Sequence, residues 1–302
     1  MRSYLHIFIL VVATFQFTQS HVHAIPQTME EEYDAATTGM LETLYGEGFL
    51  SHGGPETVSR MFKGISLHNK KMLDIGCGFG GPSIYLAKKH SVDITGIDPV
   101  KHILDKATKI ADKQQLKTKV TFILTPQLPY PFADETFDIA FSKEALLHSR
   151  EKQAVIKEIF RVLKPGGQVV ILDWVFSPAT NQSTRDLFNV PTFNPIEQQE
   201  YVEYFKDAGF NDISTAEQNN LACKYTIESI KHLKKNKESI VQKFGVHEYE
   251  EALLGWNTQY VLFKQKQVLV TLFKARKPET STGIVQPVRV FKWYNPFTWF
   301  GK

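Results

Sequence analysis

The segment MLDIGCGFGG, Met72 to Gly81, most constrains the fold, because it places four glycines directly after a short apolar run. Glycine adopts positive φ at little steric cost and lets a ligand approach the backbone closely. A buried strand that turns through such a loop into a helix holds the phosphate or nucleoside part of a cofactor. The segment therefore predicts a strand–loop–helix unit with a nucleotide-like ligand.

Short apolar runs alternate with helical patterns on both sides of this loop. Such alternation predicts βαβ units and a parallel sheet covered by helices on both faces. We expect an α/β, Rossmann-like, doubly wound and mostly parallel sheet with a helical N-terminal segment and a helical lid insertion. The seven predicted strands are KMLDI (71–75), VDITGID (92–98), KVTFIL (119–124), FDIAFS (137–142), QVVILDWVF (168–176), NDISTAE (211–217) and QVLVTLFKARK (267–277).

The two ends of the chain differ from this pattern. Arg2, an apolar run over 5–17 and the A-x-A-like Val22-His23-Ala24 predict a secretory signal peptide or membrane anchor over 1–24. We therefore expect a secreted, periplasmic or membrane-associated protein. If the start or the cleavage site is misread, we expect a cytoplasmic one. The expected domains are a helical cap (25–67), a core (68–275) with a lid around 176–260, and a basic aromatic tail (276–302).

Composition excludes several classes of function. The formal net charge of +3 is too small for a nucleic-acid binder, and no dense basic stripe lies in the core region. Cys77 and Cys223, the two cysteines, give neither a disulfide framework nor a metal-ligand pattern, so we expect no metal. Aromatic and basic residues over 289–302 suit a peripheral membrane contact. The sequence does not specify an oligomeric state.

The glycine loop alone leaves two cofactors open. Gly76, Gly78 and Gly81 fit the dinucleotide pattern G-x-G-x-x-G, with Asp98 where a ribose-binding carboxylate belongs. With Gly80 in the third place, the same loop fits the G-x-G-x-G of adenosylmethionine enzymes. Asp74, two residues before the first glycine, would repel a diphosphate but attract an ammonium group, which favours the second interpretation.

Motifs further along the chain support this choice. D-x-G-x-G is followed by GID (96–98), by FD (137–138) at the start of a strand, and by LKPGG (163–167) at a helix-to-strand turn. Together they resemble the class I methyltransferases that depend on S-adenosyl-L-methionine. YGEGFLSHGG (45–54), Tyr33 upstream and FSKEALLH (141–148) are similar to phosphoethanolamine N-methyltransferases.

This resemblance implies a set of functional residues. Tyr33 and His148 match a catalytic pair in that family, and Glu144 matches an acidic position close to the substrate amine. The expected cofactor contacts are Ser51, Asp74, Gly76, Gly78, Gly80, Asp98, Pro99 and Lys143.

The chemistry agrees with these positions. Methyl transfer from a sulfonium is an in-line SN2 displacement, so the enzyme supplies proximity, alignment and a nucleophile with a free lone pair. A small amine is mostly protonated near neutral pH, and an imidazole titrates in the range needed to accept its proton. Trp174 and Phe176 offer aromatic faces to a methylammonium, and we place Phe193 at the substrate too.

Departures from the family pattern concern the substrate and the adenine. Positions where the family binds the substrate phosphate carry Leu187, Pro191, Phe193 and Gln259, none of which forms a charge-assisted bond. Arg185 and the lysines of 231–237 are the candidate substitutes. Pro126 and Gln127 stand where many relatives carry an adenine-binding carboxylate.

We therefore expect N-methylation of a small amine, phosphobase or amino-acid-like, and the departures favour the amino-acid-like acceptor. Two alternatives stay open. One is methylation of a hydroxyl or carbon nucleophile on a lipid-like metabolite. The other is a catalytically inactive, exported binding protein with the methyltransferase fold.

Overall fold

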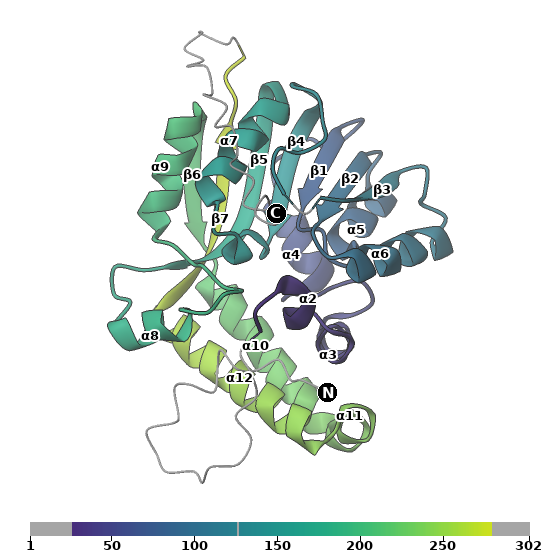
Figure 1. Ribbon diagram of the computed structural model, residues 1–302, viewed down its shortest axis with the longest axis vertical. Coiled ribbons are helices and arrows are strands. Elements are labelled where there is room, and N and C mark those ends of the chain that lie inside the picture. The colour runs from purple at the N-terminus through teal and green to yellow at the C-terminus, as the bar shows by residue number, and fades with distance from the viewer. Residues whose placement is uncertain (1–25, 126, 280–302) are drawn as a thin grey trace, which may run out of the picture.

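A seven-stranded sheet forms the centre of the computed structural model, which describes residues 26–125 and 127–279 (Figure 1). The strand order is β3-β2-β1-β4-β5-β7-β6. Strands β1 to β5 pair in parallel, and β7 runs antiparallel to both β5 and β6. The strands are β1 (Lys71–Ile75), β2 (Asp93–Asp98), β3 (Val120–Leu124), β4 (Phe137–Lys143), β5 (Leu163–Phe176), β6 (Asn211–Glu217) and β7 (Val268–Arg276).

This sheet confirms the predicted fold class, and all seven predicted strands are present. Successive residues of a strand point to opposite faces, and both faces are covered. In β1, Met72 packs into one hydrophobic cluster and Leu73 into the other. Both side chains are fully buried. The strands therefore read as continuous apolar runs rather than as alternating ones.

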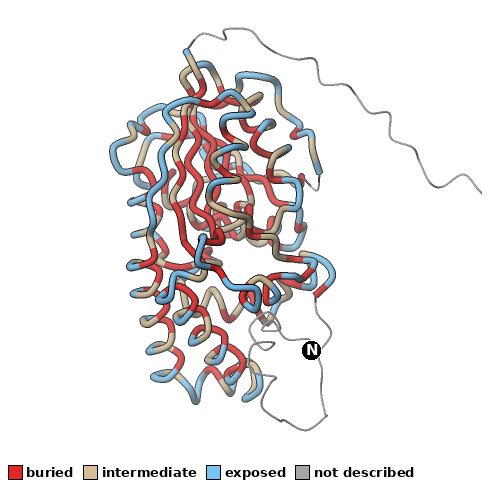
Figure 2. Tube along the Cα trace, turned by 90° about the vertical axis from the view of Figure 1, so that its left-hand side faces the viewer, coloured by how far each residue is buried: buried red, intermediate tan, exposed pale blue. Residues whose placement is uncertain are grey.

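Helices cover both faces of the sheet. The clusters pack α4, α5, α10 and α12 against one face and α7 and α9 against the other. The helices are α2 (Met29–Glu32), α3 (Ala35–Tyr45), α4 (Gly54–Met61), α5 (Gly81–Lys89), α6 (Lys101–Lys113), η1 (Leu146–His148), α7 (Lys152–Val162), α8 (Gln182–Leu187), α9 (Gln198–Ala208), α10 (Asn219–Lys235), α11 (Lys237–Phe244) and α12 (Val246–Lys264). In Figure 2 the strands are mostly buried, whereas the outer helices alternate buried and exposed residues.

The N-terminal segment begins with two separate helices, α2 and α3. Tyr33 ends α2, and Asp34 begins α3 as its N-cap, accepting hydrogen bonds from the backbone N–H of Ala36 and Thr37. An aspartate in this position satisfies free N–H groups that a continuous helix would not present. The break turns α2 away from α3 and toward the carboxyl ends of the strands.

The region expected as a lid, 176–260, contains elements of different kinds. Strand β6 joins the sheet and α9 packs on α7, so both continue the core. The helices α10 and α12 pack on each other below the strand ends, and α11 packs on α12 (Figure 1). The sequence analysis did not predict α12, because its residues show weak amphipathic patterning.

Several predictions fall outside the part of the chain that the structure describes. The signal or anchor over 1–24 and the membrane contact over 289–302 lie there and stay predictions. Among the described helices, none has the length and apolarity needed to cross a membrane.

Tyr201 and Asp173 link α9 to the sheet through a buried hydrogen bond. The Tyr201 hydroxyl donates to Asp173 Oδ2 at 2.6 Å, and both side chains are fully buried. Asp173 also accepts from the Leu147 N–H at 3.1 Å, one residue before His148. Burial raises the pKa of Asp173 to about 6 although the hydrogen bonds oppose that rise.

We expect Tyr201→Phe to lower the free energy of unfolding by about 1–3 kcal/mol, because it leaves a buried carboxyl oxygen without its donor. Urea unfolding at pH 7 measures this. Tyr204→Phe on the same helix is the matched control: its hydroxyl bonds to Glu200 in a half-exposed position, and its loss should cost less than about 0.5 kcal/mol. Equal effects of the two substitutions would contradict the prediction.

Candidate active site

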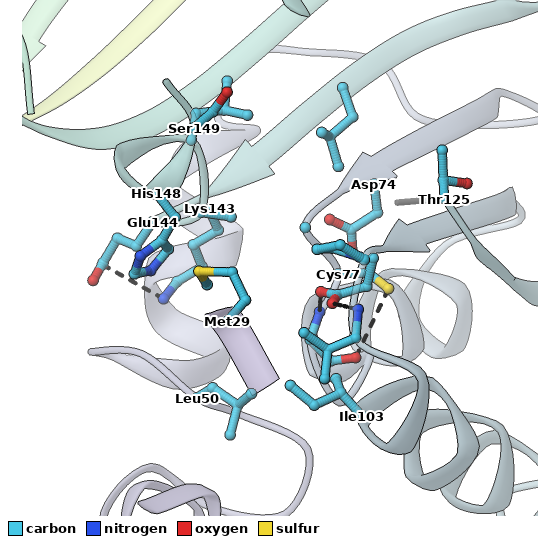
Figure 3. A pocket seen from close by; sticks show the side chains of 18 of the residues that line it. Met29, Leu50, Asp74, Cys77, Ile103, Thr125, Lys143, Glu144, His148 and Ser149 are labelled. Atoms are coloured by element: carbon cyan, nitrogen blue, oxygen red, sulfur yellow. Dashed lines mark hydrogen bonds and ion pairs between the residues drawn. The ribbon is translucent and has the colours of Figure 1, made fainter. Parts of the chain in front are cut away.

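A cavity of about 350 Å³ opens at the carboxyl ends of β1, β2 and β4 (Figure 3). The sheet order reverses between β1 and β4, and open α/β sheets bind ligands at such a point. The cavity is lined by the glycine loop, by the segment after β2, by residues after β4, and by parts of the N-terminal segment. The lining includes Met29, Tyr33, Ser51, Asp74, Gly76, Gly78, Asp98, Pro99, Lys143, Glu144 and His148.

The glycine loop has the geometry that its sequence predicts. Gly76 and Gly78 have φ values of +69° and +54°. A Cβ atom on Gly76 would lie 2.3 Å from the Cβ of Ala145, so a side chain there would clash. Gly80 does not line the cavity. It has φ +77° and a Cβ there would lie 2.3 Å from Phe122 Cζ, so its role is in packing at the start of α5.

Two buried carboxylates flank this loop. Asp74 accepts a hydrogen bond from Ser83 Oγ at 2.6 Å. Asp98 accepts from the backbone N–H of Gly78 and of Val100, both at 3.0 Å, so it fixes the loop from the neighbouring strand. Burial raises the pKa of Asp74 to about 7 and that of Asp98 to about 6. A ligand that brings positive charge or hydroxyl donors would compensate this burial, as an ammonium and a ribose do.

Tyr33 and His148, 115 residues apart, meet above the cavity. The Tyr33 hydroxyl lies 2.8 Å from His148 Nε2. His148 Nδ1 lies 2.6 Å from the carbonyl oxygen of Thr192. Because a carbonyl only accepts, Nδ1 carries the proton, and Nε2 accepts from the Tyr33 hydroxyl. Burial lowers the pKa of His148 to about 4, so the imidazole is neutral at pH 7.

Glu144 follows β4 with a φ of +52°, an unfavourable conformation for a residue with a Cβ. Its carboxylate lies 3.6 Å from Lys143 Nζ and 3.5 Å from His52 Nδ1. Burial opposes its ionisation, but Lys143 and His52 outweigh that effect and hold the pKa of Glu144 below its ordinary value. The Lys143 ammonium also donates to Ser51 Oγ. A buried carboxylate thus stays ionised beside the Tyr33–His148 pair.

His52 is a site residue that the sequence analysis missed. It is buried, and its ring packs against Tyr45 and Trp174 at centroid distances of 5.1 and 6.4 Å. The sequence feature that could have identified His52 is its position between Ser51 and Gly53 in the motif YGEGFLSHGG.

The three aromatic residues expected at the substrate do not line the cavity. Phe193 packs against the His148 ring at a centroid distance of 4.6 Å. Trp174 packs edge-on against Phe263, and Phe176 against Phe188. Trp174 and Phe176, two residues apart on β5, point into the apolar layer that α12 covers, and Phe193 packs against this layer. Their contact with substrate stays a prediction.

The described lining contains Lys143 and no other lysine or arginine. None of the four phosphate-binding positions of the family, Leu187, Pro191, Phe193 and Gln259, lines the cavity. The candidate substitutes do not line it either: Arg185 pairs with Glu197 at 2.6 Å, and the lysines of 231–237 lie elsewhere on α10 and α11. Within the described residues, no cluster of three His, Cys, Asp or Glu side chains has the arrangement of a metal site.

Comparison with known proteins gives consistent matches. Residues 66–209 match the model of a methyltransferase domain family. Phosphoethanolamine N-methyltransferase 3 of Arabidopsis thaliana is 29% identical over 82% of this chain and 50% of its own length. Phosphoethanolamine N-methyltransferase of Plasmodium falciparum is 25% identical over 82% of this chain and 93% of its own length. The chain spans about half the length of the plant relatives that it matches.

Solved structures agree on the fold. Phosphoethanolamine N-methyltransferase 2 of Haemonchus contortus, in complex with phosphomonomethylethanolamine and S-adenosylhomocysteine, superposes with a TM-score of 0.76. It is 24% identical and the match covers 83% of this chain and 59% of that one.

The neutral state of His148 is directly measurable. The unfolded chain takes up this proton near the ordinary value of 6.5, and the folded chain only near 4. His148 therefore stabilises the fold fully above pH 6.5 and loses this contribution as the pH falls toward 4. We expect NMR of the imidazole carbon to show a midpoint near pH 4, with the resonance assigned through its absence in His148→Gln. A midpoint at 6 or above would contradict the buried, Tyr33-bonded arrangement.

Proposed function

We propose that this protein transfers a methyl group from S-adenosyl-L-methionine to the nitrogen of a small amine. Residues 66–209 match a methyltransferase domain, and most of the chain resembles phosphoethanolamine N-methyltransferases. The family match confirms the expected enzyme class and cofactor. The single observation that supports an amine as the methyl acceptor is the buried, ionised Glu144 beside the Tyr33–His148 pair.

The residues of the cavity fit this cofactor, whose sulfonium supplies an activated methyl group when it is bound. Asp74, at the end of β1, suits the ammonium of its methionine part, and Asp98, at the end of β2, suits the ribose hydroxyls. Pro99 and Ser51 bound the space beside them. The bare backbone at Gly76 and Gly78 leaves room for the ligand between these groups.

The acceptor nitrogen is handled by Glu144, Tyr33 and His148. An amine arrives mostly as an ammonium ion, which the Glu144 carboxylate attracts in a site of low dielectric. Tyr33 Oη can accept a proton from this ammonium while its own proton passes to His148 Nε2. The neutral imidazole is in the form required to accept it, and the nitrogen is left with a free lone pair.

Charge at this centre supports an acceptor without a phosphate. Burial raises the pKa of Tyr33 well above its usual range, and the carboxylates of Glu32, Asp98 and Glu144 raise it further. A phosphate would meet these negative charges with Lys143 as the one cation of the described lining. An amine whose other end is neutral, or carries the single negative charge of a carboxylate rather than the greater charge of a phosphate, agrees better with the site than phosphoethanolamine does.

A test of this function uses labelled S-adenosyl-L-methionine with a panel of amines that includes phosphoethanolamine, its methylated derivatives and N-methylated glycines. We expect transfer to an amine, with His148→Ala and Tyr33→Phe lowering kcat by about 10²–10⁴-fold while the affinity for S-adenosylhomocysteine stays within a few-fold. Transfer to hydroxyl or carbon acceptors alone, or a His148→Ala rate within a few-fold of the wild type, would contradict the proposal.

Cofactor binding is tested separately by calorimetry with S-adenosylhomocysteine. Asp98→Asn should weaken binding by about 10–100-fold, because it loses a charged acceptor that also fixes the loop at Gly78. Asp93→Asn, at the other, exposed end of the same strand, is the matched control and should leave the affinity unchanged. Absence of binding by the wild type would instead favour a catalytically inactive binding protein.

A further inference from the structure

The short helix α2 is attached over the cavity by two adjacent side chains, Glu32 and Tyr33. The Tyr33 hydroxyl bonds to His148 Nε2, as described above. The Glu32 carboxyl oxygen Oε2 accepts a hydrogen bond of 2.9 Å from the Thr192 hydroxyl. Thr192 in turn accepts, through its carbonyl oxygen, the hydrogen bond from His148 Nδ1. Four residues therefore close one ring of contacts, in which Thr192 serves both the helix and the histidine.

This ring joins three parts of the chain that are far apart in sequence. Glu32 and Tyr33 come from the N-terminal segment, His148 from the turn after β4, and Thr192 from the loop between α8 and α9. The loop is itself fixed beside His148, since the Asn194 N–H donates to the Leu147 carbonyl at 2.7 Å. Met29 and Tyr33 line the cavity, so α2 is part of its wall (Figure 3).

Glu32 is an unusual residue to place in such a contact. It is 7% exposed and Thr192 is 2% exposed. Within the described residues, the Glu32 carboxyl accepts a side-chain hydrogen bond from this one hydroxyl and forms no ion pair. Burying a carboxyl group with so little compensation is costly, and an apolar residue would seal the same contact without that cost.

We propose that Glu32 and Thr192 are positioning residues, which couple the closing of α2 over the cavity to the assembly of the Tyr33–His148 pair. When α2 lies in place, Glu32 engages Thr192, and Thr192 holds the His148 ring with Nε2 toward Tyr33. When α2 leaves, the Thr192 hydroxyl loses its acceptor and the imidazole loses the Tyr33 hydroxyl. The catalytic consequence rests on the proposed methyl transfer, whereas the closing itself does not.

Closing is expected to depend on pH through Glu32. Burial raises the pKa of Glu32 to about 7, and the Thr192 hydrogen bond offsets part of the rise. In the open state the carboxyl titrates near 4.5, so closing is most favourable below that pH and weakens as the pH rises toward 7. The adjacent Tyr33 interacts with the neutral His148, with the carboxylates of Asp98 and Glu144, and with His102, whose Nε2 bonds to the Tyr33 carbonyl. Exposed Glu30 and Glu31 lie on the same helix.

The first experiment measures the dissociation rate of S-adenosylhomocysteine by stopped flow at pH 5.5 and 7.5. Thr192→Val removes the hydroxyl but keeps the shape and the backbone carbonyl, and should release the ligand about 5–10-fold faster at pH 5.5. Thr192→Ser restores the hydroxyl and should stay within two-fold of the wild type. Glu32→Gln keeps an acceptor without a charge, so it should remove the part of the pH dependence that Glu32 contributes and release more slowly than the wild type at pH 7.5. The pH dependence that remains comes from Asp74 and Asp98, whose raised pKa values also lie in this range.

Glu30→Gln is the matched control, since it removes a charge from the exposed side of the same helix. Its release rate and pH dependence should equal those of the wild type. The proposal is overturned if Thr192→Val releases the ligand at the wild-type rate, or if Glu32→Gln keeps the wild-type pH dependence. A purely structural role would lower the melting temperature of Thr192→Val without changing the pH dependence of release.

Two further readouts separate this inference from the proposed function. In the free protein, the His148 Nδ1–H proton should give a protected downfield NMR signal in the wild type and Thr192→Ser, and an exchange-broadened one in Thr192→Val. With an active amine acceptor, Thr192→Val should lower kcat while the KM for the amine changes little. If no acceptor is methylated, the proposed function fails, and the NMR signal still decides the positioning role.

Discussion

Burial of carboxyl groups at the carboxyl ends of the parallel strands is the constraint on which this structure depends. Asp74, Asp98 and Glu144 each follow or end a strand, and all are withdrawn from water. Such burial costs free energy unless donors surround each group. The donors come from the loop after β1, from α5 and from the N-terminal segment, so the groups that would bind a ligand also join these elements.

The N-terminal segment depends on the same constraint. It contributes Ser51 and His52 to the Lys143–Glu144 pair, and Tyr33 to His148. Burial keeps His148 neutral, whereas Lys143 and His52 keep Glu144 ionised against the effect of burial. The pKa values of Glu144 and His148 are both lowered, so at pH 7 Glu144 is ionised and His148 is neutral. The carboxylate can attract a cation, and the imidazole can accept a proton.

The sequence analysis succeeded where local chemistry decides structure. The glycines of 76–81 require positive φ, and the apolar runs of the core require burial on both faces, so the sheet and the position of the cavity followed directly. Tyr33, Glu144 and His148 were found through the motifs that contain them. The analysis did not foresee that Trp174 and Phe176 lie outside the cavity lining, because residue type alone does not distinguish an aromatic side chain facing a ligand from one packed in a core. It missed His52 for the converse reason, since a lone histidine in a glycine-rich turn carries no periodic signal.

By itself, the sequence determined the strand–loop–helix unit, the seven strands along the chain, and the carboxylates near the ends of β1 and β2. These features depend on residues within a few positions of one another. The tertiary structure decided which side chains meet across 90 residues or more: Tyr33 with His148, Glu32 with Thr192, and His52 with Glu144. Their charge states were also decided there, because a pKa depends on burial and on neighbours in space, and no local pattern contains that information.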